Sequence, residues 1–215
     1  MFEVNKLGGS LLGEAGWPGR FVRWRRDRED TPTILLVGGG KMIDAMRDLD
    51  AVHRLDNTAM HWRCVHMLRH TADVAAELLR QSGVDLSLLT TLAEVAEFVG
   101  DARSGAANRP MLSIAYADAV YRSDFTDAYA QLPEHLRQHV RHEPELLLPQ
   151  IGWQTTSDAI AIHLAARCGA TRCVLLKNCE VDGYRDLADA AAAGVVDPET
   201  PHLAAEFPQV SLVQL

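Results

Sequence analysis

Short runs rich in apolar residues alternate along the chain with longer segments in which apolar residues recur every three or four positions. A short apolar run is typical of a parallel strand covered on both faces, whereas the longer spacing indicates a helix. The predicted strands are residues 2–7, 33–37, 84–89, 110–115, 172–177 and 210–213. The predicted helices are 17–28, 41–55, 57–83, 95–99 and 159–166. This alternation predicts an α/β fold, a three-layer sandwich around a mainly parallel central sheet.

Chemical signals mark several helix boundaries. Asn57 can cap the helix that ends near Gly83, and Ser157 can cap the helix before Gly169. Thr91 with Glu94 forms a capping-box pattern, in which two side chains satisfy backbone N–H groups at the helix start.

The 215 residues are expected to form a single domain, 1–215, with a helical insertion at about 123–148. This stretch is polar and breaks the alternation, and Pro133 lies near an expected helix start, so we interpret it as an inserted excursion or lid. Its three histidines, at 135, 139 and 142, most simply form a solvated face, although contact with an anionic substrate is an alternative.

Charge and composition exclude several classes of protein. The net charge is −8, which argues against a nucleic-acid partner. The chain has no signal-peptide pattern and no apolar run long enough to span a membrane, so we expect a cytoplasmic protein without a membrane partner. The four cysteines have irregular spacing, and His66 and His70 lack the rest of a zinc motif, so no metal site is predicted.

Two glycine-rich turns each follow a predicted strand. The first is Lys6-Leu7-Gly8-Gly9-Ser10 and the second is Gly38-Gly39-Gly40. Glycines let backbone N–H groups approach an anion, and a following helix start adds a favourable dipole. Either turn alone is equally well explained as a tight strand-to-helix connection. Neither is a Walker A loop, because Met42 stands where that motif needs Ser or Thr.

Two further charged residues accompany these turns. Asp158 falls in the first turn of a predicted apolar helix, and Lys177 lies at the carboxyl end of a predicted strand, where open α/β sheets bind ligands. Alone, the aspartate could simply favour the helix dipole and the lysine could be solvated. Together with the two glycine turns, they indicate a site that holds two anionic groups, as phosphoryl transfer requires.

These four elements, in this order, resemble the amino acid kinase family, which includes acetylglutamate, aspartate and uridylate kinases and has the carbamate kinase-like fold. Within the family, the sequence is most similar to the archaeal kinases of methanofuran biosynthesis, which phosphorylate aminomethylfuranmethanol phosphate. Residues 38–50, His61, 153–158 and 196–200 carry that closer resemblance.

The resemblance implies an ATP-dependent phosphotransferase that uses ATP and Mg²⁺ and acts on a small anionic metabolite. Lys6 would contact the transferring phosphoryl group, Asp158 would organise the lysines, and Lys177 would border the nucleotide. Implied nucleotide-binding residues are Gly8, Gly9, Ser10, Lys177, Val181, Asp182, Gly183 and Tyr184. Implied acceptor-binding residues are Gly38, Gly39, Gly40, Thr156 and Ser157.

The sequence also departs from the family's pattern. No lysine follows Lys177, and the chain stops at Leu215, just after the last predicted strand. Alternatives are therefore a non-catalytic nucleotide- or anion-binding protein on the same scaffold, or a kinase for a carboxylate or a nucleotide. The resemblance further implies a homodimer or higher homo-oligomer, in which Trp62, Met67 and Leu68 of the 57–83 helix could meet a second subunit.

Overall fold

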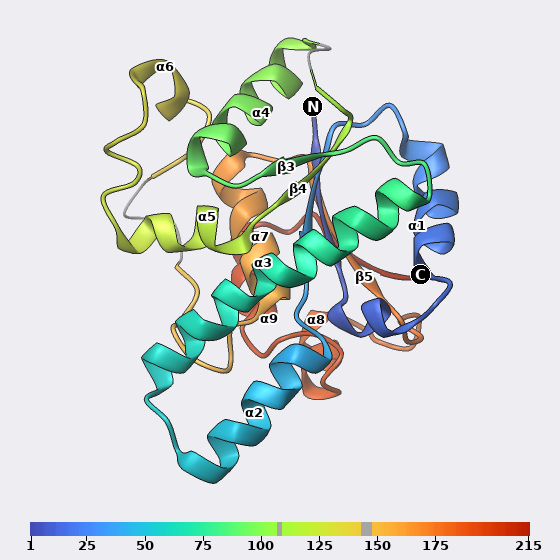
Figure 1. Ribbon diagram of the computed structural model, residues 1–215, viewed down its shortest axis with the longest axis vertical. Coiled ribbons are helices and arrows are strands. Elements are labelled where there is room, and N and C mark those ends of the chain that lie inside the picture. The colour runs from blue at the N-terminus through green and yellow to red at the C-terminus, as the bar shows by residue number, and fades with distance from the viewer. Residues whose placement is uncertain (107–108, 143–147) are drawn as a thin grey trace.

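The computed structural model describes residues 1–106, 109–142 and 148–215 (Figure 1). Six strands form one sheet in the order β3-β4-β2-β1-β5-β6, and each pair of neighbours is parallel. The strands are β1 Glu3–Leu7, β2 Thr33–Val37, β3 Ser87–Leu89, β4 Leu112–Ala115, β5 Arg172–Lys177 and β6 Val210–Gln214. The predicted α/β architecture with a mainly parallel sheet is therefore confirmed.

Helices cover both faces of this sheet (Figure 1). The α-helices are α1 Trp17–Arg25, α2 Lys41–His53, α3 Asn57–Gln81, α4 Leu92–Ser104, α5 Ala117–Tyr121, α6 Glu134–Arg137, α7 Ser157–Cys168, α8 Leu187–Ala192 and α9 Thr200–Glu206. Short 3-10 helices are η1 Gly9–Gly13, η2 Arg26–Arg28 and η3 Arg122–Phe125. No helix among the described residues is both long and apolar enough to cross a bilayer.

The apolar strands divide their side chains between two cores. In β2, Ile34 and Leu36 pack with α4, α5 and α7, whereas Leu35 and Val37 pack with α1 and the second half of α3. Alternate residues of a strand point to opposite faces, so a strand that is buried on both sides favours apolar residues at every position. β2 and the centre of β5 follow this pattern, whereas β1 is buried on both faces and carries Glu3, Asn5 and Lys6.

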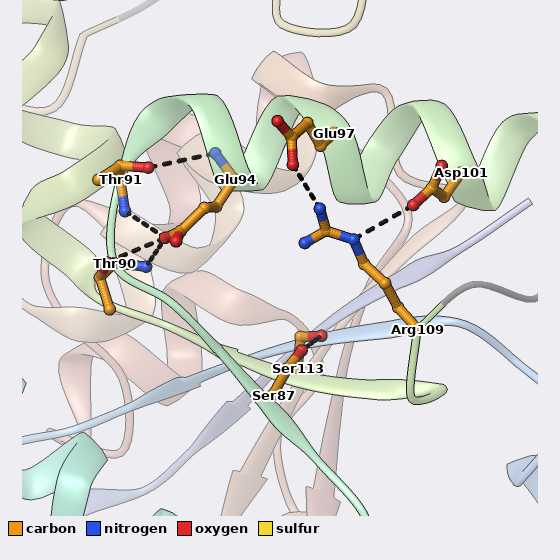
Figure 2. A network of polar contacts seen from close by, with 8 residues as sticks. All are labelled: Ser87, Thr90, Thr91, Glu94, Glu97, Asp101, Arg109 and Ser113. Atoms are coloured by element: carbon orange, nitrogen blue, oxygen red, sulfur yellow. Dashed lines mark hydrogen bonds and ion pairs between the residues drawn. The ribbon is translucent and has the colours of Figure 1, made fainter.

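The capping box predicted for α4 is confirmed. The Thr91 hydroxyl accepts from the Glu94 N–H, and the Glu94 carboxylate accepts from the Thr91 N–H in return (Figure 2). One turn further along, Arg109 donates to Glu97 and Asp101 on the surface of the same helix (Figure 2).

Two of the other predicted caps are wrong. Asp56, not Asn57, caps α3, because its Oδ1 accepts from the Ala59 N–H at 2.7 Å. Ser157 is the first residue of α7, and no side chain of the adjacent residues caps that helix. Gly169 does end α7, in the left-handed conformation with φ of 63°, as predicted.

The segment from residue 123 to 142 is less helical than its sequence suggests. Apart from the end of η3, its one α-helix is α6, which has four residues and begins after Pro133. Leu132, Leu136 and Val140 are buried in the core, and α6 contacts α4. The remaining residues of the predicted insertion, apart from Leu148, lie outside the described ranges.

Leu68 of α3 is buried in the chain's own core, and Trp62 and Met67 are half-buried against it. The pairing of this helix with a second subunit stays a prediction.

Candidate functional site

The parallel sheet brings the ends of three strands to one edge, the edge at which α2 begins (Figure 1). Lys6 lies near the end of β1, and Lys177 ends the neighbouring β5. Lys6 is two residues from Val4, and Lys177 is two residues from Leu175, so both lysines project to the face that packs against α7. Strand periodicity therefore places both ammonium groups beside the start of that helix.

One carboxylate holds both lysines. Lys6 Nζ lies 2.8 Å from Asp158 Oδ1, and Lys177 Nζ lies 2.6 Å from Asp158 Oδ2. Asp158 is the second residue of α7, and the three side chains are only 3 to 7% exposed. We call Lys6, Asp158 and Lys177 the lysine clamp. The structure thus brings together the three residues predicted to be catalytic.

The lysine clamp contains two cations and one anion, and this imbalance shifts the pKa values of its members. Burial opposes ionisation of Asp158, but the ammonium groups of Lys6 and Lys177 outweigh it and hold its pKa below the usual value. The pKa of Lys177 is lowered, first by burial and then by the charge of Lys6, with Asp158 acting in the opposite direction. Two cations share one anion, so the three residues by themselves carry an excess of positive charge when all are ionised.

The two glycine turns touch each other beside the lysine clamp. A Cβ on Gly9 would lie 2.1 Å from the Gly40 nitrogen, and Gly40 itself has φ of +53°. A Cβ on Gly38 would lie 3.0 Å from Ser157 Oγ and 3.2 Å from Lys6 Cε. No residue with a side chain fits at these positions, since real Cβ atoms do not approach backbone so closely.

Hydrogen bonds join the first glycine turn to β5. The Gly8 N–H donates to the Leu176 carbonyl at 2.9 Å, and the Ser10 hydroxyl donates to Asn178 Oδ1 at 2.8 Å. Asn178 in turn donates to Glu14 Oε1 at 3.1 Å. The turn is thereby fixed against the strand that carries Lys177.

A residue that sequence reasoning did not select as a site residue fixes the start of α7. Asp197 Oδ2 accepts from the Thr156 N–H at 2.9 Å and from the Ala159 N–H at 3.1 Å, and its Oδ1 accepts from the Thr156 hydroxyl. Its only sequence signal was its place in the 196–200 stretch. Burial and then the negative charge of Asp158 raise the pKa of Asp197, against the effect of Lys6.

A cavity of about 490 Å³ opens beside the lysine clamp. Predicted site residues that line it are Lys6, Gly9, Ser10, Gly39, Gly40, Thr156, Ser157 and Asp158. Lys177, Gly8 and Gly38 do not line the cavity. Lys177 contacts the lining residue Asp158, and Gly8 and Gly38 belong to the two glycine turns. None of the described residues in 123–142 lines this cavity.

The far wall of the cavity is aromatic and basic. Trp153 donates from its indole nitrogen to Asp50 Oδ2 at 2.7 Å, and Arg47 lies over its ring at 5.4 Å. His61 accepts from the Gly152 N–H through Nδ1 at 3.2 Å, and burial lowers its pKa, which favours the neutral imidazole. These contacts tie the loop before α7 to α2 and α3 and so close one side of the cavity.

The loop from Val181 to Tyr184 does not join this arrangement. It lies on the surface after β5, and a Cβ on Gly183 would meet no atom within 4 Å. Tyr184 packs against the main core instead. These four predicted nucleotide-binding residues are therefore placed next to Lys177 in the chain but do not line the cavity.

The arrangement suits an anionic ligand. The starts of α2 and α7 reach the cavity, and a helix start carries a partial positive charge. At α7, Asp197 already accepts from the Thr156 and Ala159 N–H groups. Both oxygens of Asp158 are occupied by lysines, and no group of three or more potential metal ligands occurs among the described residues.

Comparisons with known proteins show the fold. No protein-family model matches the sequence, and no curated protein is detectably similar to it. Aspartate kinase from Synechocystis is similar in structure over 100% of this chain, with a TM-score of 0.63 and 14% identity, and the chain spans only 38% of that kinase. UMP kinase from Ureaplasma parvum has a TM-score of 0.58 and 14% identity over 100% of this chain and 89% of its own. The chain therefore has the α/β fold of these two kinases.

Proposed function

We propose that this protein is an ATP-dependent phosphotransferase of the amino acid kinase type, which acts on a small anionic metabolite. The lysine clamp is the observation that carries the proposal. Two buried ammonium groups share one carboxylate beside two touching glycine turns, at the edge where parallel strands end. Two structural neighbours with this fold are named as kinases, which supports the same chemistry.

The residues present fit a nucleoside triphosphate. Gly9 and Ser10 line the same cavity as Lys6, and the missing Cβ of Gly9 lets the two glycine turns lie against each other there. Mg²⁺ would arrive with ATP and neutralise phosphate charge when bound. The proposed role of Asp158 is to hold the two ammonium groups, because each of its oxygens already lies within 2.8 Å of one of them.

The lysine clamp would act mainly by position and charge. Phosphoryl transfer needs in-line placement and compensation of charge on the phosphoryl oxygens, and it needs little covalent help from the protein. Lys6 faces the cavity and would contact the transferred group, whereas Lys177 would border the nucleotide. Both ammonium groups are held in place before any ligand arrives, so no reorganisation is needed at the moment of transfer.

The acceptor is proposed to lie beside the second glycine turn, near Thr156 and Ser157. A phosphomonoester such as aminomethylfuranmethanol phosphate fits the resemblance in sequence, and Arg47 lines that part of the cavity together with its ion-pair partner Asp44. We also propose that the protein works in the cytoplasm as a homodimer or higher homo-oligomer, without a nucleic-acid or membrane partner.

The decisive experiment measures ADP release from ATP and Mg²⁺ with a panel of phosphomonoester, carboxylate and nucleotide acceptors. Lys6→Ala should lower kcat/KM at least about 100-fold, the usual effect of removing one charge-stabilising donor. Arg109→Gln is the matched control, because it removes a cation from an exposed pair on α4, outside the cavity (Figure 2).

Two outcomes would contradict the proposal. If ATP does not bind at millimolar concentration with Mg²⁺ present, the site is not a nucleotide site. If ATP binds but no acceptor in the panel yields ADP above background, and Lys6→Ala changes affinity alone, the protein is a non-catalytic binder on the kinase fold.

A further inference from the structure

Asp197 joins the lysine clamp to a third part of the chain. It lies between α8 and α9, is 8% exposed, and accepts hydrogen bonds from the backbone N–H groups of Thr156 and Ala159. These two residues flank Asp158. The start of α7 is therefore held by a carboxylate that is 41 positions away from Thr156 in the sequence.

The contacts show what that carboxylate controls. Lys6 and Lys177 belong to neighbouring strands of the sheet, whereas Asp158 belongs to the first turn of a helix. The orientation of that turn decides whether Asp158 meets both ammonium groups. No side chain at the adjacent N-cap position bonds the free N–H groups of the turn, so Asp197 takes this role.

Asp197 also takes part in the charge balance of the site. Its negative charge acts on Lys177, and the charges of Lys6 and Asp158 act on it in turn. Asp158 is the carboxylate that contacts the two lysines, and Asp197 contacts the backbone on either side of it. An ordinary exposed cap, such as Asp186 at the start of α8, bonds the Asp189 N–H at 2.9 Å without touching the lysine clamp.

We propose that Asp197 is a positioning residue: it fixes the first turn of α7 so that Asp158 lies between Lys6 and Lys177. The effect of Asp197 on catalysis rests on the proposed phosphotransferase function. The effect of Asp197 on the surroundings of the two lysines does not rest on that function, so the two effects can be tested separately.

The first test uses the lysines themselves. The chain has only three, and Lys41 is exposed at the start of α2, outside the residues that line the cavity, so it serves as an internal reference. Trace acetylation with acetic anhydride, read by mass spectrometry, gives the reactivity of Lys6 and Lys177 relative to Lys41. Asp197→Ala should raise both ratios at least about threefold, because the first turn of α7 opens locally.

Two further variants give this test its controls. Asp197→Asn keeps one carbonyl oxygen as an acceptor, so its ratios should lie between those of wild type and Asp197→Ala; it also carries the test if the alanine variant does not fold. Asp186→Ala removes an ordinary helix cap and should leave both ratios at the wild-type value. Unchanged ratios in both Asp197 variants, or an equal rise in Asp186→Ala, would overturn the proposal.

The second test measures ATP turnover. Asp197→Ala should lower kcat about 10- to 100-fold, because displacement of catalytic groups by about 1 Å is this costly. The KM for ATP should change less than about threefold, since Lys6 and the glycine turns remain. A kcat equal to that of wild type in Asp197→Ala contradicts the proposal. Absence of turnover in wild type contradicts the proposed function instead, and the acetylation ratios still decide the role of Asp197.

Discussion

Replacement of Asp158 by asparagine tests the physical basis of the lysine clamp. The substitution keeps the shape of the side chain but removes the only carboxylate within 2.8 Å of both Lys6 and Lys177 in the described residues. The three side chains are 3 to 7% exposed, so water screens their charges little. Two buried ammonium groups would then face each other with an uncharged amide between them.

The cost follows from that burial. Removal of one partner from a buried ion pair destabilises a protein by about 3–5 kcal/mol, since the remaining charge is left without compensation. With a urea dependence of about 2 kcal/mol per molar for a chain of this size, a loss of about 4 kcal/mol lowers the unfolding midpoint by about 2 M.

The pH dependence of this loss has a definite sign. The pKa of Asp158 is lowered in the folded protein, so its contribution is present above the unfolded pKa and disappears as the pH falls through the folded value. The pKa of Lys177 is also lowered, and it should fall further in the variant. Near pH 10 the folded variant can then hold Lys177 neutral. The difference from wild type should therefore be greatest near neutral pH and should shrink at both extremes.

The assay is urea unfolding followed by tryptophan fluorescence at about pH 2.5, 7 and 10 for wild type and Asp158→Asn, because the charge of Asp158 is lost only below its unfolded pKa. The control is Asp101→Asn, which removes a carboxylate from the half-exposed surface pair with Arg109 and should cost less than about 1 kcal/mol (Figure 2). A midpoint within about 0.3 M of wild type at pH 7, or an equal loss at all three pH values, would refute the argument that the lysines depend on a buried charge.

Other properties follow from the same structure. Gly9→Ala should cost about 1–3 kcal/mol in urea unfolding, because the added methyl meets the second glycine turn, whereas Gly13→Ala has room; equal midpoints would contradict this. Thr91→Ala should cost about 1 kcal/mol in the same assay, since it removes half of the capping box. Exposed Cys179 should react with Ellman's reagent in the native protein, while Cys168, whose pKa burial raises to about 12, should react only after unfolding. Fast modification of Cys168 would show that this part of the core opens readily.

Local sequence determined most of the secondary structure. The bounds of β2 and β5 were predicted to the residue, because a strand buried on both faces needs an unbroken apolar run and its ends are marked by polar residues. Helix ends were less certain. Asp56 and Asn57 are both good capping residues, and the choice between them depends on the angle at which the chain enters α3.

The candidate site was predictable in part for the same reason. Lys6, Asp158 and Lys177 each stood at the end of a recognisable element, and parallel pairing brings such ends together. The distances between them, and the burial that sets their pKa values, arise only when α7 packs on the sheet.

The sequence by itself therefore determined the alternation of strands and helices, the two glycine turns and the faces on which the lysines project. These depend on neighbours within a few residues, through backbone periodicity and the missing Cβ of glycine. Only the tertiary structure decided that Asp197 holds the start of α7, that Val181–Tyr184 stays outside the cavity and that residues 132–140 join the core. Those outcomes depend on which surfaces meet after the chain has closed, and no local pattern records them.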